Sequence, residues 1–371
     1  MSKKLTRGDA RLNIHPGEWY FGNEYESLYT VLGSCVALSL WHPKLKIDYD
    51  YDDAAGKAMV IIEQTQKTDK VFKLPIAIDI YNGAAKKRYN VWVENKIDTF
   101  TFNYATHPDL INVDADKVML WQKTDNKTAE NFIAQYKYAP LFLDRREALD
   151  YFAKKKMKEL AEGLKDKYGP LREFTLNKLA ESTAAPDASV LQATEQLIAK
   201  EKNKKAKAAA INLLVKTGDA KYLPVYKANI NDSSYSVAGA ALNGLASLEP
   251  ENAYTLAKKY SSDAKGDLGT AVDGIIIENG TEADFDFIAT RFDKAPLSQS
   301  KFESLEGFCN FLGKVKNLDN VKKGIDMVVK FRNAIPESFR GFTDPAINAS
   351  LKKVSAAKGK EIEDYINEKL K

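Results

Sequence analysis

Apolar and polar residues alternate with a period of two across residues 58–121, which is typical of β-strands. In residues 76–81 the three isoleucines fall on one face and the residues between them on the other. Asn82-Gly83 follows, and both residue types accept the positive φ of a tight hairpin turn. Residues 88–93 then form the expected return strand. Further short strands are expected at 58–66, 99–102, 111–113 and 118–121. Strands at this spacing predict a small β-sandwich.

From residue 144 onward the apolar positions take the spacing of amphipathic helices. Asp144 followed by Glu147 has the form of a capping box, which predicts a helix start. One apolar face then continues as far as Gly169-Pro170, where the helix is expected to end. That face consists of Leu149, Phe152, Leu160 and Leu164. Further helices are expected over 174–180 and after the cap at 184–187.

A short apolar pattern recurs three times in the helical region. It starts at Ala210, Ala241 and Ala271, so the steps are 31 and 30 residues. Each copy is followed by a polar turn and a second helix, at 222–230, 253–260 and 285–292. Paired helices that repeat in this way indicate an α-solenoid, here HEAT-like because the step is shorter than the usual HEAT repeat. A fourth pair is expected at 307–315 and 321–331, with a polar cap at 347–370.

The repeat pattern leads to two expectations about which residues are buried. Ala210, Ala241 and Ala271 are expected where neighbouring helices approach closely, because small side chains permit short interaxial distances. Leu213 and Leu245 are expected to be buried, since each repeat hides its apolar face only against the next one.

These patterns predict a multidomain fold of the β then all-α class. The expected parts are an N-terminal segment over 1–46, a β-sandwich over 47–125 and a HEAT-like α-helical repeat domain over 126–371. The acidic, aromatic stretch 49–53 is interpreted as a solvated linker before the sandwich. Its aspartates could suggest calcium, but the spacing, glycine and terminal glutamate of an EF-hand loop are missing.

Composition narrows the function classes. The 55 basic and 51 acidic residues are well mixed and give a net charge of +4. This distribution creates no electrostatic field large enough to indicate binding to nucleic acid or to an anionic membrane. The lysine cluster over 200–207 has no interleaved aromatic residues, so a solvated helix end is favoured over a nucleic-acid site. The start of the chain has no signal-peptide pattern and no run of 18 apolar residues occurs, so a cytoplasmic location is expected. Cys35 and Cys309 do not form a disulfide framework.

One N-terminal motif resembles the chemoreceptor glutamine deamidases of the CheD family. The motif is Thr30-Val31-Leu32-Gly33-Ser34-Cys35-Val36-Ala37-Leu38, with Pro16-Gly17-Glu18 upstream. The resemblance implies that Cys35 is the nucleophile and that Thr30 orients the histidine that activates it. Such chemistry needs a thiolate, a histidine and a polar orienting group.

The histidine of that family should follow a Gly-Gly pair beyond the next turn. In this chain the corresponding stretch, 47–53, contains neither, and His42 comes only seven residues after Cys35. The alternative is that Cys35 is a buried, unreactive strand cysteine, because apolar burial raises the pKa of a thiol.

The rest of the chain, from about residue 42 to 371, resembles the region that follows the catalytic domain in zinc aminopeptidases of the alanyl-aminopeptidase type. The matching motifs are Gln64-Thr65-Gln66, Phe72-Lys73-Leu74-Pro75, Ile111-Asn112-Val113-Asp114 and Arg145-Arg146-Glu147-Ala148. The resemblance implies a β-sandwich followed by a helical-repeat domain, the order that the patterns predict independently.

The catalytic motifs of that family are not in this sequence. Its zinc is held by H-E-x-x-H and a further glutamate, and a G-x-M-E-N loop binds the substrate amine. The chain has three histidines, His15, His42 and His107, and none lies four residues from another. We therefore expect no metal site and no cofactor.

The sequence thus joins a truncated deamidase-like start to an aminopeptidase-like remainder. A gene fusion, a laboratory fusion or an assembly artefact would each produce such a chimera. The leading hypothesis is a non-catalytic C-terminal region that shapes the substrate chamber of a zinc metallo-aminopeptidase. The alternatives are a solenoid that binds a peptide or protein partner, and a cysteine-dependent deamidase of chemotaxis that uses Cys35. Whether the chain is an enzyme stays open, and neither nucleic acid nor a membrane is expected as a partner.

Overall fold

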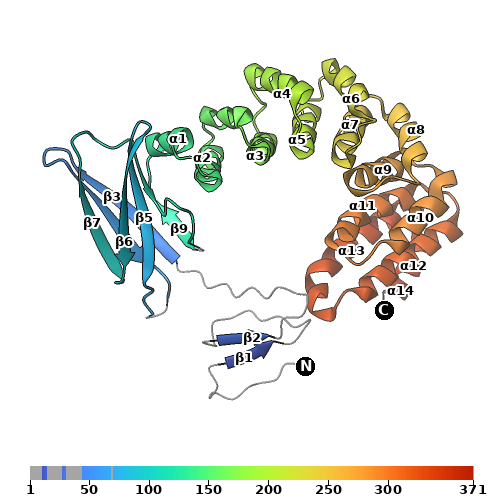
Figure 1. The fold of residues 1–371 in the computed structure, drawn as a ribbon. Coiled ribbons are helices and arrows are strands. Elements are labelled where there is room, and N and C mark those ends of the chain that lie inside the picture. Colours follow the sequence, from blue (N-terminus) through green and yellow to red (C-terminus); the bar gives the residue numbers. More distant parts are fainter. Residues whose placement is uncertain (1–10, 15–26, 31–43, 68–69, 120, 371) are drawn as a thin grey trace. The chain divides into compact units, whose positions relative to one another are not determined.

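The computed structural model describes residues 11–14, 27–30, 44–67, 70–119 and 121–370. The chain divides into two compact units, residues 1–151 and 152–371. Every described strand lies in the first unit, and the helices from residue 158 onward lie in the second (Figure 1). The predicted order, β then all-α, is confirmed.

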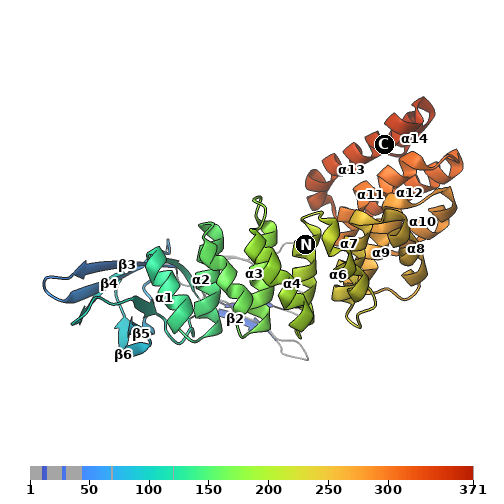
Figure 2. The ribbon, with the colours of Figure 1, turned by 90° about the horizontal axis from the view of Figure 1, so that it is seen from above.

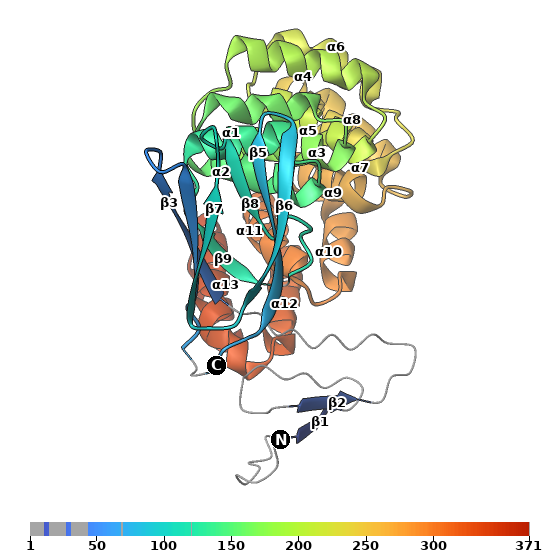
Figure 3. The ribbon, with the colours of Figure 1, turned by 60° about the vertical axis from the view of Figure 1, so that its left-hand side comes forward.

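The described strands of the first unit form three sheets, which Figure 3 shows from another side. A parallel pair consists of β1 (Arg11–Ile14) and β2 (Ser27–Thr30). A four-stranded sheet has the order β7 (Ile97–Asn103), β4 (Lys57–Gln64), β3 (Lys44–Asp52) and β9 (Gln122–Asp125). A three-stranded sheet has the order β6 (Ala85–Val93), β5 (Leu74–Asn82) and β8 (Leu110–Val113). All neighbours are antiparallel except β1 with β2 and β3 with β9.

The two larger sheets share one apolar core. Inward residues of β4, such as Val60 and Ile62, are buried in the same cluster as Ile76 and Ile78 of β5. The predicted isoleucine face of β5 is therefore confirmed. On the other face Asp79 and Tyr81 are buried as well, and Tyr81 joins a small core with residues of α1 (Ala129–Tyr138).

The predicted hairpin turn is confirmed at Gly83. This residue has φ of 56°, a conformation that costs glycine nothing and other residues more. The β3–β4 hairpin turns at Gly56, with φ of 62°. A Cβ there would lie 2.6 Å from the carbonyl oxygen of Tyr104, so close backbone approach also requires glycine.

The linker predicted over 49–53 is wrong, because β3 continues to Asp52. Leu45, Ile47, Tyr49 and Tyr51 alternate with polar residues, and the first two are fully buried. The strand pairs with β4 along its length and with β9 at its start. The aspartates simply occupy the outer face of this strand.

The strand predicted over 118–121 is also wrong, since β9 begins at Gln122. Asp114 and Lys117 both have positive φ and turn the chain. The carboxylate of Asp114 accepts hydrogen bonds from the backbone N–H groups of Val118 and Met119, which therefore do not pair with a strand.

The first helices begin earlier than predicted. Helix α1 is capped by Thr128 and Asn131, whose side chains and backbone N–H groups bond reciprocally. Helix α2 (Phe142–Lys154) contains Asp144 as its third residue, and that carboxylate accepts from the N–H of Leu141. Asp144 is thus the reciprocal acceptor of the first turn and not the N-cap residue.

The long helix predicted from 144 to 169 is interrupted. Helix α2 ends at Lys154, Lys156 has φ of 55°, and the short 3-10 helix η1 (Lys158–Lys165) follows. Its Leu160 and Leu164 are buried as predicted. Helix α3 (Gly169–Glu181) then starts at Gly169-Pro170, because proline suits the first helical turn.

The second unit continues as a row of helices (Figures 1 and 2). Its members after α3 are α4 (Ala188–Lys200), α5 (Lys204–Val215), η2 (Ala220–Tyr222), α6 (Leu223–Asn229), α7 (Tyr235–Leu248), α8 (Pro250–Tyr260), α9 (Gly266–Asn279), η3 (Glu282–Asp284), α10 (Phe285–Lys294), α11 (Gln299–Lys314), α12 (Leu318–Ala334), α13 (Glu337–Lys358) and α14 (Lys360–Lys369). Two apolar cores run through the row, one around α3 to α7 and one from α7 to α14.

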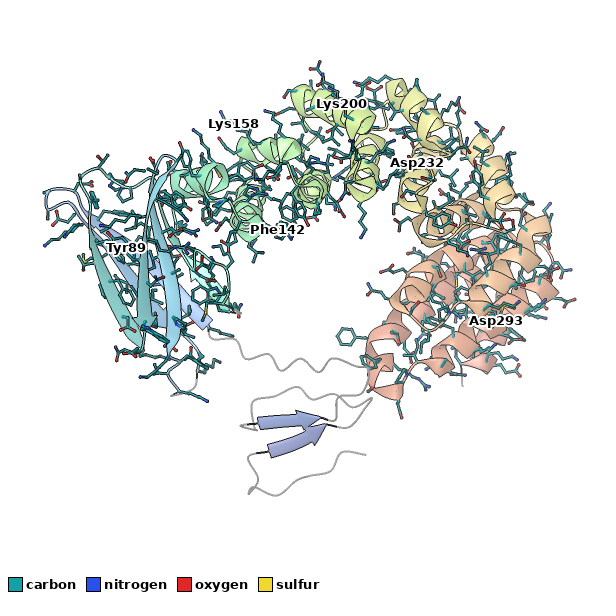
Figure 4. All side chains as sticks on the ribbon, viewed as in Figure 1. Tyr89, Phe142, Lys158, Lys200, Asp232 and Asp293 are labelled. Atoms are coloured by element: carbon teal, nitrogen blue, oxygen red, sulfur yellow. The ribbon has the colours of Figure 1, made fainter. Side chains whose placement is uncertain are left out.

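The three predicted helix pairs over 204–292 are present: α5 with α6, α7 with α8, and α9 with α10. Their first helices pack side by side, α5 on α7 and α7 on α9. The three repeat alanines are buried, and so are Leu213 and Leu245, as predicted. Asp232, labelled in Figure 4, lies between α6 and α7 and accepts from Lys204 Nζ of α5 at 2.7 Å.

Close helix packing in this row depends on small residues. A Cβ at Gly239 of α7 would lie 2.7 Å from the carbonyl oxygen of Asp267. A Cβ at Gly244 would lie 2.7 Å from the ring of Tyr226. Both contacts are too short for a side chain, so these glycines permit the observed helix separation.

Leu213→Ala should lower the free energy of unfolding by about 2–5 kcal/mol, because Leu213 is fully buried in the core of α3 to α7. The measurement is urea unfolding followed by helical circular dichroism. Lys205→Ala, at an exposed position of the same helix, is the matched control and should change stability little. Equal effects of the two substitutions would contradict the burial argument.

Candidate functional site

Of the two residues predicted by the deamidase hypothesis, Thr30 lies within the part of the chain that the structure describes. Cys35 lies outside the described residues. Thr30 is the last residue of β2, where its backbone is in register with Ile14 of β1. The predicted catalytic roles of Cys35 and Thr30 therefore stay predictions.

Of the three histidines, His15 and His42 lie outside the described residues. His107 lies between β7 and β8, as predicted for a turn. Its Nδ1 is 2.8 Å from Asp53 Oδ1, and its ring contacts the rings of Tyr51 and Tyr104. The side chains of His107 and Asp53 are largely exposed, which is the environment of a surface turn.

The described residues contain no group of three His, Cys, Asp or Glu side chains that could hold a metal ion. Two aspartates of the stretch 48–53 have partners within the protein. Asp48 pairs with Lys46 at 2.7 Å and accepts from Asn126 at 2.5 Å, while Asp53 accepts from Tyr104 and contacts His107.

The strongest electrostatic feature is a cluster of six charged side chains in the first unit, where the strands end and α1 and α2 begin. We call it the ionic junction; its members are Lys117, Lys123, Asp125, Lys127, Asp144 and Glu147. Three positive and three negative groups balance one another. Five of the six side chains are at most 13% exposed, and the sixth is 27% exposed.

On one side of the ionic junction, lysines bind the carboxylates of α2. Lys117 Nζ lies 3.1 Å from both Asp144 Oδ1 and Glu147 Oε2. Lys123 Nζ lies 2.9 Å from Glu147 Oε1. The connection between β8 and β9, the strand β9 and the helix α2 are thereby held together.

On the other side, Lys127 binds Asp125. Lys127 Nζ lies 2.9 Å from Asp125 Oδ2 and donates to Gln135 Oε1 at 2.8 Å. Tyr49 of β3 donates its hydroxyl to Asp125 Oδ1 at 2.8 Å. Gln135 of α1 in turn donates to the backbone oxygen of Asp144 at 2.9 Å, which connects both sides.

Burial and charge act in opposite directions on these groups. Burial raises the pKa of Asp125, but the ammonium groups of Lys127 and Lys123 outweigh it and lower this pKa to about 2. Burial lowers the pKa of Lys127 to about 8, although Asp125 opposes that effect. Burial also raises the pKa of Glu147, but Lys123 and Lys117 lower it below its usual value.

Motifs on which the aminopeptidase resemblance rests lie where different elements of the first unit contact one another. Asn112 donates to Asp144 Oδ1 at 2.9 Å and accepts from Lys117 at 3.2 Å. The fully buried side chain of Gln64 bonds both the oxygen and the N–H of Phe72, at 2.8 and 2.9 Å. Gln64 thus supplies the backbone of Phe72 with both of its hydrogen-bond partners, whereas Asn112 connects side chains of the ionic junction.

The ionic junction is therefore a structural joint. Its charges are compensated within the protein, and little of the cluster faces solvent where a substrate could reach it. Sequence reasoning missed it, although one signal was available. Lys123, Asp125 and Lys127 are spaced by two, so an extended chain places all three charges on one face.

In the second unit, α7 and α9 border an open hollow of about 610 Å³. We call it the α7–α9 hollow; it is lined by Asn243, Ala246, Ser247, Pro250, Asp267, Thr270, Ala271, Gly274, Ile275, Glu278 and Asn279. Its size is in the range of sites that hold a small ligand or a stretch of peptide.

Comparison with known proteins gives short or distant similarities. No protein-family model matches the chain. The curated "Probable chemoreceptor glutamine deamidase CheD 1" of Chromobacterium violaceum is 50% identical over 34 residues, which are 9% of this chain and 18% of that protein. The corresponding "CheD 3" of Dechloromonas aromatica is 47% identical over 34 residues, 9% of this chain and 20% of that protein. The chain thus spans about a fifth of the length of these curated relatives.

Among solved structures, the chain is similar to Legionella pneumophila aminopeptidase A in complex with aspartic acid. The TM-score is 0.49 at 12% sequence identity, over 89% of this chain and 49% of that chain. Within the part of this chain that the structure describes, no helix has the length and apolar character needed to cross a membrane.

Acid should destabilise the first unit through Asp125. Because the pKa of Asp125 is about 2 in the folded chain and 3.8 ordinarily, its contribution is complete above about pH 4 and is lost as the pH falls toward 2. Asp125→Asn should flatten this part of the pH dependence. It should also lower stability at pH 7 by about 3–5 kcal/mol, since Lys127 loses its buried partner.

The measurement is urea unfolding between pH 2 and pH 7, followed by tryptophan fluorescence. All four tryptophans, at positions 19, 41, 92 and 121, precede the second unit in the sequence. Asp50→Asn, at an exposed position of β3, is the control. If the native chain and the Asp125→Asn variant lost the same stability as the pH fell from about 4 toward 2, Asp125 would have no such role.

Proposed function

We propose that residues from about 42 to 371 form the non-catalytic region that follows the catalytic domain in a zinc aminopeptidase of the alanyl-aminopeptidase type. In the whole enzyme this region would form one wall of the chamber that holds the peptide substrate. The chain would then act on peptides by enclosing and orienting them, while the reacting groups belong to the catalytic domain.

One observation carries this proposal: the residues on which the resemblance rests form specific hydrogen bonds and ion pairs in the fold. Asn112 and Glu147 belong to the contacts that join strands to helices, and Gln64 secures the chain at Phe72. A chance match of short motifs would not select buried, hydrogen-bonded polar residues, which are rare and costly unless paired.

The finer fold description belongs to the same proposal. A β-sandwich is supported by the single apolar core that the four-stranded and three-stranded sheets share. A HEAT-like repeat is supported by the three successive helix pairs and by the side-by-side packing of their first helices. Both are the elements that the resemblance implies for a post-catalytic region.

The purified chain should hold no stoichiometric zinc and should not cleave an aminoacyl-arylamide, because a catalytic zinc needs three protein ligands and an open position. Metal analysis and arylamide hydrolysis measure this. A separately expressed catalytic region of an alanyl-type aminopeptidase should co-elute with the chain and change its preference among peptides of different length.

The chain with the ionic junction broken by Asp125→Asn serves as the control for co-elution. Stoichiometric zinc together with arylamide cleavage by the chain alone would overturn the proposal. The proposal would also be overturned if the catalytic region did not bind the chain and kept the same peptide preference in its presence.

A glutamine deamidase is the second candidate, favoured by the identity of 50% over 34 residues to a CheD protein. It would require Cys35 as nucleophile, with a histidine within about 2.6–3.2 Å of its sulfur. Since the sequence offers no histidine at the position that the family uses, we rank this function lower.

We expect no ammonia release from a glutamine-containing receptor peptide, measured with a coupled ammonia assay. The matched variants are Cys35→Ser and Cys309→Ser. Cys309 is fully buried, and burial raises the pKa of its thiol to about 12, so it cannot serve as a nucleophile. Release that disappears in Cys35→Ser and persists in Cys309→Ser would reverse the ranking.

A further inference from the structure

Three polar side chains of the α7–α9 hollow, Ser247, Thr270 and Asn279, offer hydrogen-bond acceptors to a ligand. Ser247 and Thr270 donate their hydroxyls to carbonyl oxygens of their own helices, at 2.8 and 3.3 Å, which leaves the hydroxyl oxygens as acceptors. Asn279 likewise donates its amide to the oxygen of Ile275, at 3.0 Å, and keeps its own oxygen free to accept. A matching ligand must therefore bring donors.

The hollow is also negatively charged. Its ionisable lining residues are Asp267 and Glu278, both exposed, and neither forms an ion pair with any described residue. One described cation, Lys314, donates to the backbone oxygen of Glu278 at 2.5 Å and not to its carboxylate. Two unpaired carboxylates on one surface favour a ligand with positive charge.

Glu278 is placed against the preference of its own helix. It lies in the last turn of α9, where the helix dipole favours cations and disfavours an acidic side chain. Asp267, in the first turn, has the favourable position. The helix dipole thus accounts for an acidic residue at position 267 but not for one at position 278.

The hollow has open space at Gly274. This residue is exposed, and a Cβ added to it would meet nothing within 4 Å. The lining also includes the small residues Ala246 and Ala271. The space at Gly274 has room for an extended backbone, whose N–H groups are further donors.

The spacing of the two carboxylates sets the length of the ligand. From 267 to 278 is 11 residues, which at a rise of ~1.5 Å per residue is about 16 Å along α9. In an extended peptide, two side chains four residues apart point to the same face and are separated by about 13 Å. Flexible lysine side chains can span the difference.

We propose that the α7–α9 hollow binds an extended peptide segment that carries two basic side chains four residues apart, one on Asp267 and one on Glu278. This inference deepens the proposed function, since it names the class of peptide that the helical surface would hold. It rests on that proposal only for its biological purpose, because the binding itself is a property of the second unit.

The experiment is fluorescence anisotropy with the full chain and a labelled Ala/Ser peptide that has lysines at positions i and i+4. A peptide with two adjacent lysines has the same charge with the wrong spacing, and a peptide with both lysines acetylated has the same length without charge. The i,i+4 peptide should bind most tightly, and its affinity should fall as salt is added.

The variants separate charge from shape. Asp267→Asn and Glu278→Gln should each weaken binding about threefold and together about tenfold, the usual effect of exposed ion pairs. Gly274→Leu should weaken it about tenfold by filling the open space at this position. Glu251→Gln, an exposed acid outside the hollow, and Gly341→Leu, an exposed helical glycine with equally open surroundings, are the matched controls and should change nothing.

Equal affinity for the i,i+4 and adjacent-lysine peptides would overturn the spacing argument, and equal loss in Gly274→Leu and Gly341→Leu would overturn the assignment to this hollow. The aminopeptidase proposal can fail separately. Binding of the i,i+4 peptide without any effect of the chain on a catalytic region would leave the peptide site standing and remove only the enzyme context.

Discussion

The ionic junction is the constraint on which the first unit depends. Moving a charged side chain out of water costs several kcal/mol per ion, and a partner restores this only with good geometry. Three lysines and three carboxylates meet this condition together, with Asn112, Gln135 and Tyr49 satisfying further polar atoms. Because each group depends on its neighbours, β9, α1 and α2 can adopt few alternative arrangements.

Such a cluster is, by itself, weak evidence for high overall stability. Apolar residues of similar size could pack as well or better in the same space, whereas loss of one charge leaves another buried without a partner. Both effects are visible in the pKa values of one ion pair. The pKa of Asp125 is lowered to about 2 by neighbouring lysines, and the pKa of Lys127 is lowered to about 8 by burial. The first shows a well-compensated charge, and the second shows what burial costs when compensation is incomplete.

The second unit is held together in a different way. Its helices pack through alanine, glycine and branched apolar residues, and each first helix contacts its neighbours in the row. Contributions in such a row add from one neighbour to the next, so no single contact decides the fold. Surface positions are correspondingly free to vary, and the α7–α9 hollow lies on such a surface.

The sequence by itself determined the order of elements and much of the apolar core. Period-two alternation located β4, β5 and β6, Asn82-Gly83 located their turn, and the repeated alanines located the three helix pairs. These are local signals, because each depends on residues close together in the chain. The burial of Leu213 and Leu245 followed from the same repeat.

Tertiary structure alone decided the rest. Asp144 has the sequence signal of a helix cap, yet Asn112 and Lys117, about thirty positions earlier, make it part of a buried cluster. The strand β3 is read as a linker from its aspartates, but pairing with β4 and β9 supplies hydrogen bonds that local composition does not show. The α7–α9 hollow joins residues of two helices whose close approach depends on Gly239. Each of these features depends on contacts between distant parts of the chain, and a pattern read along the sequence contains no information about which distant residues will meet.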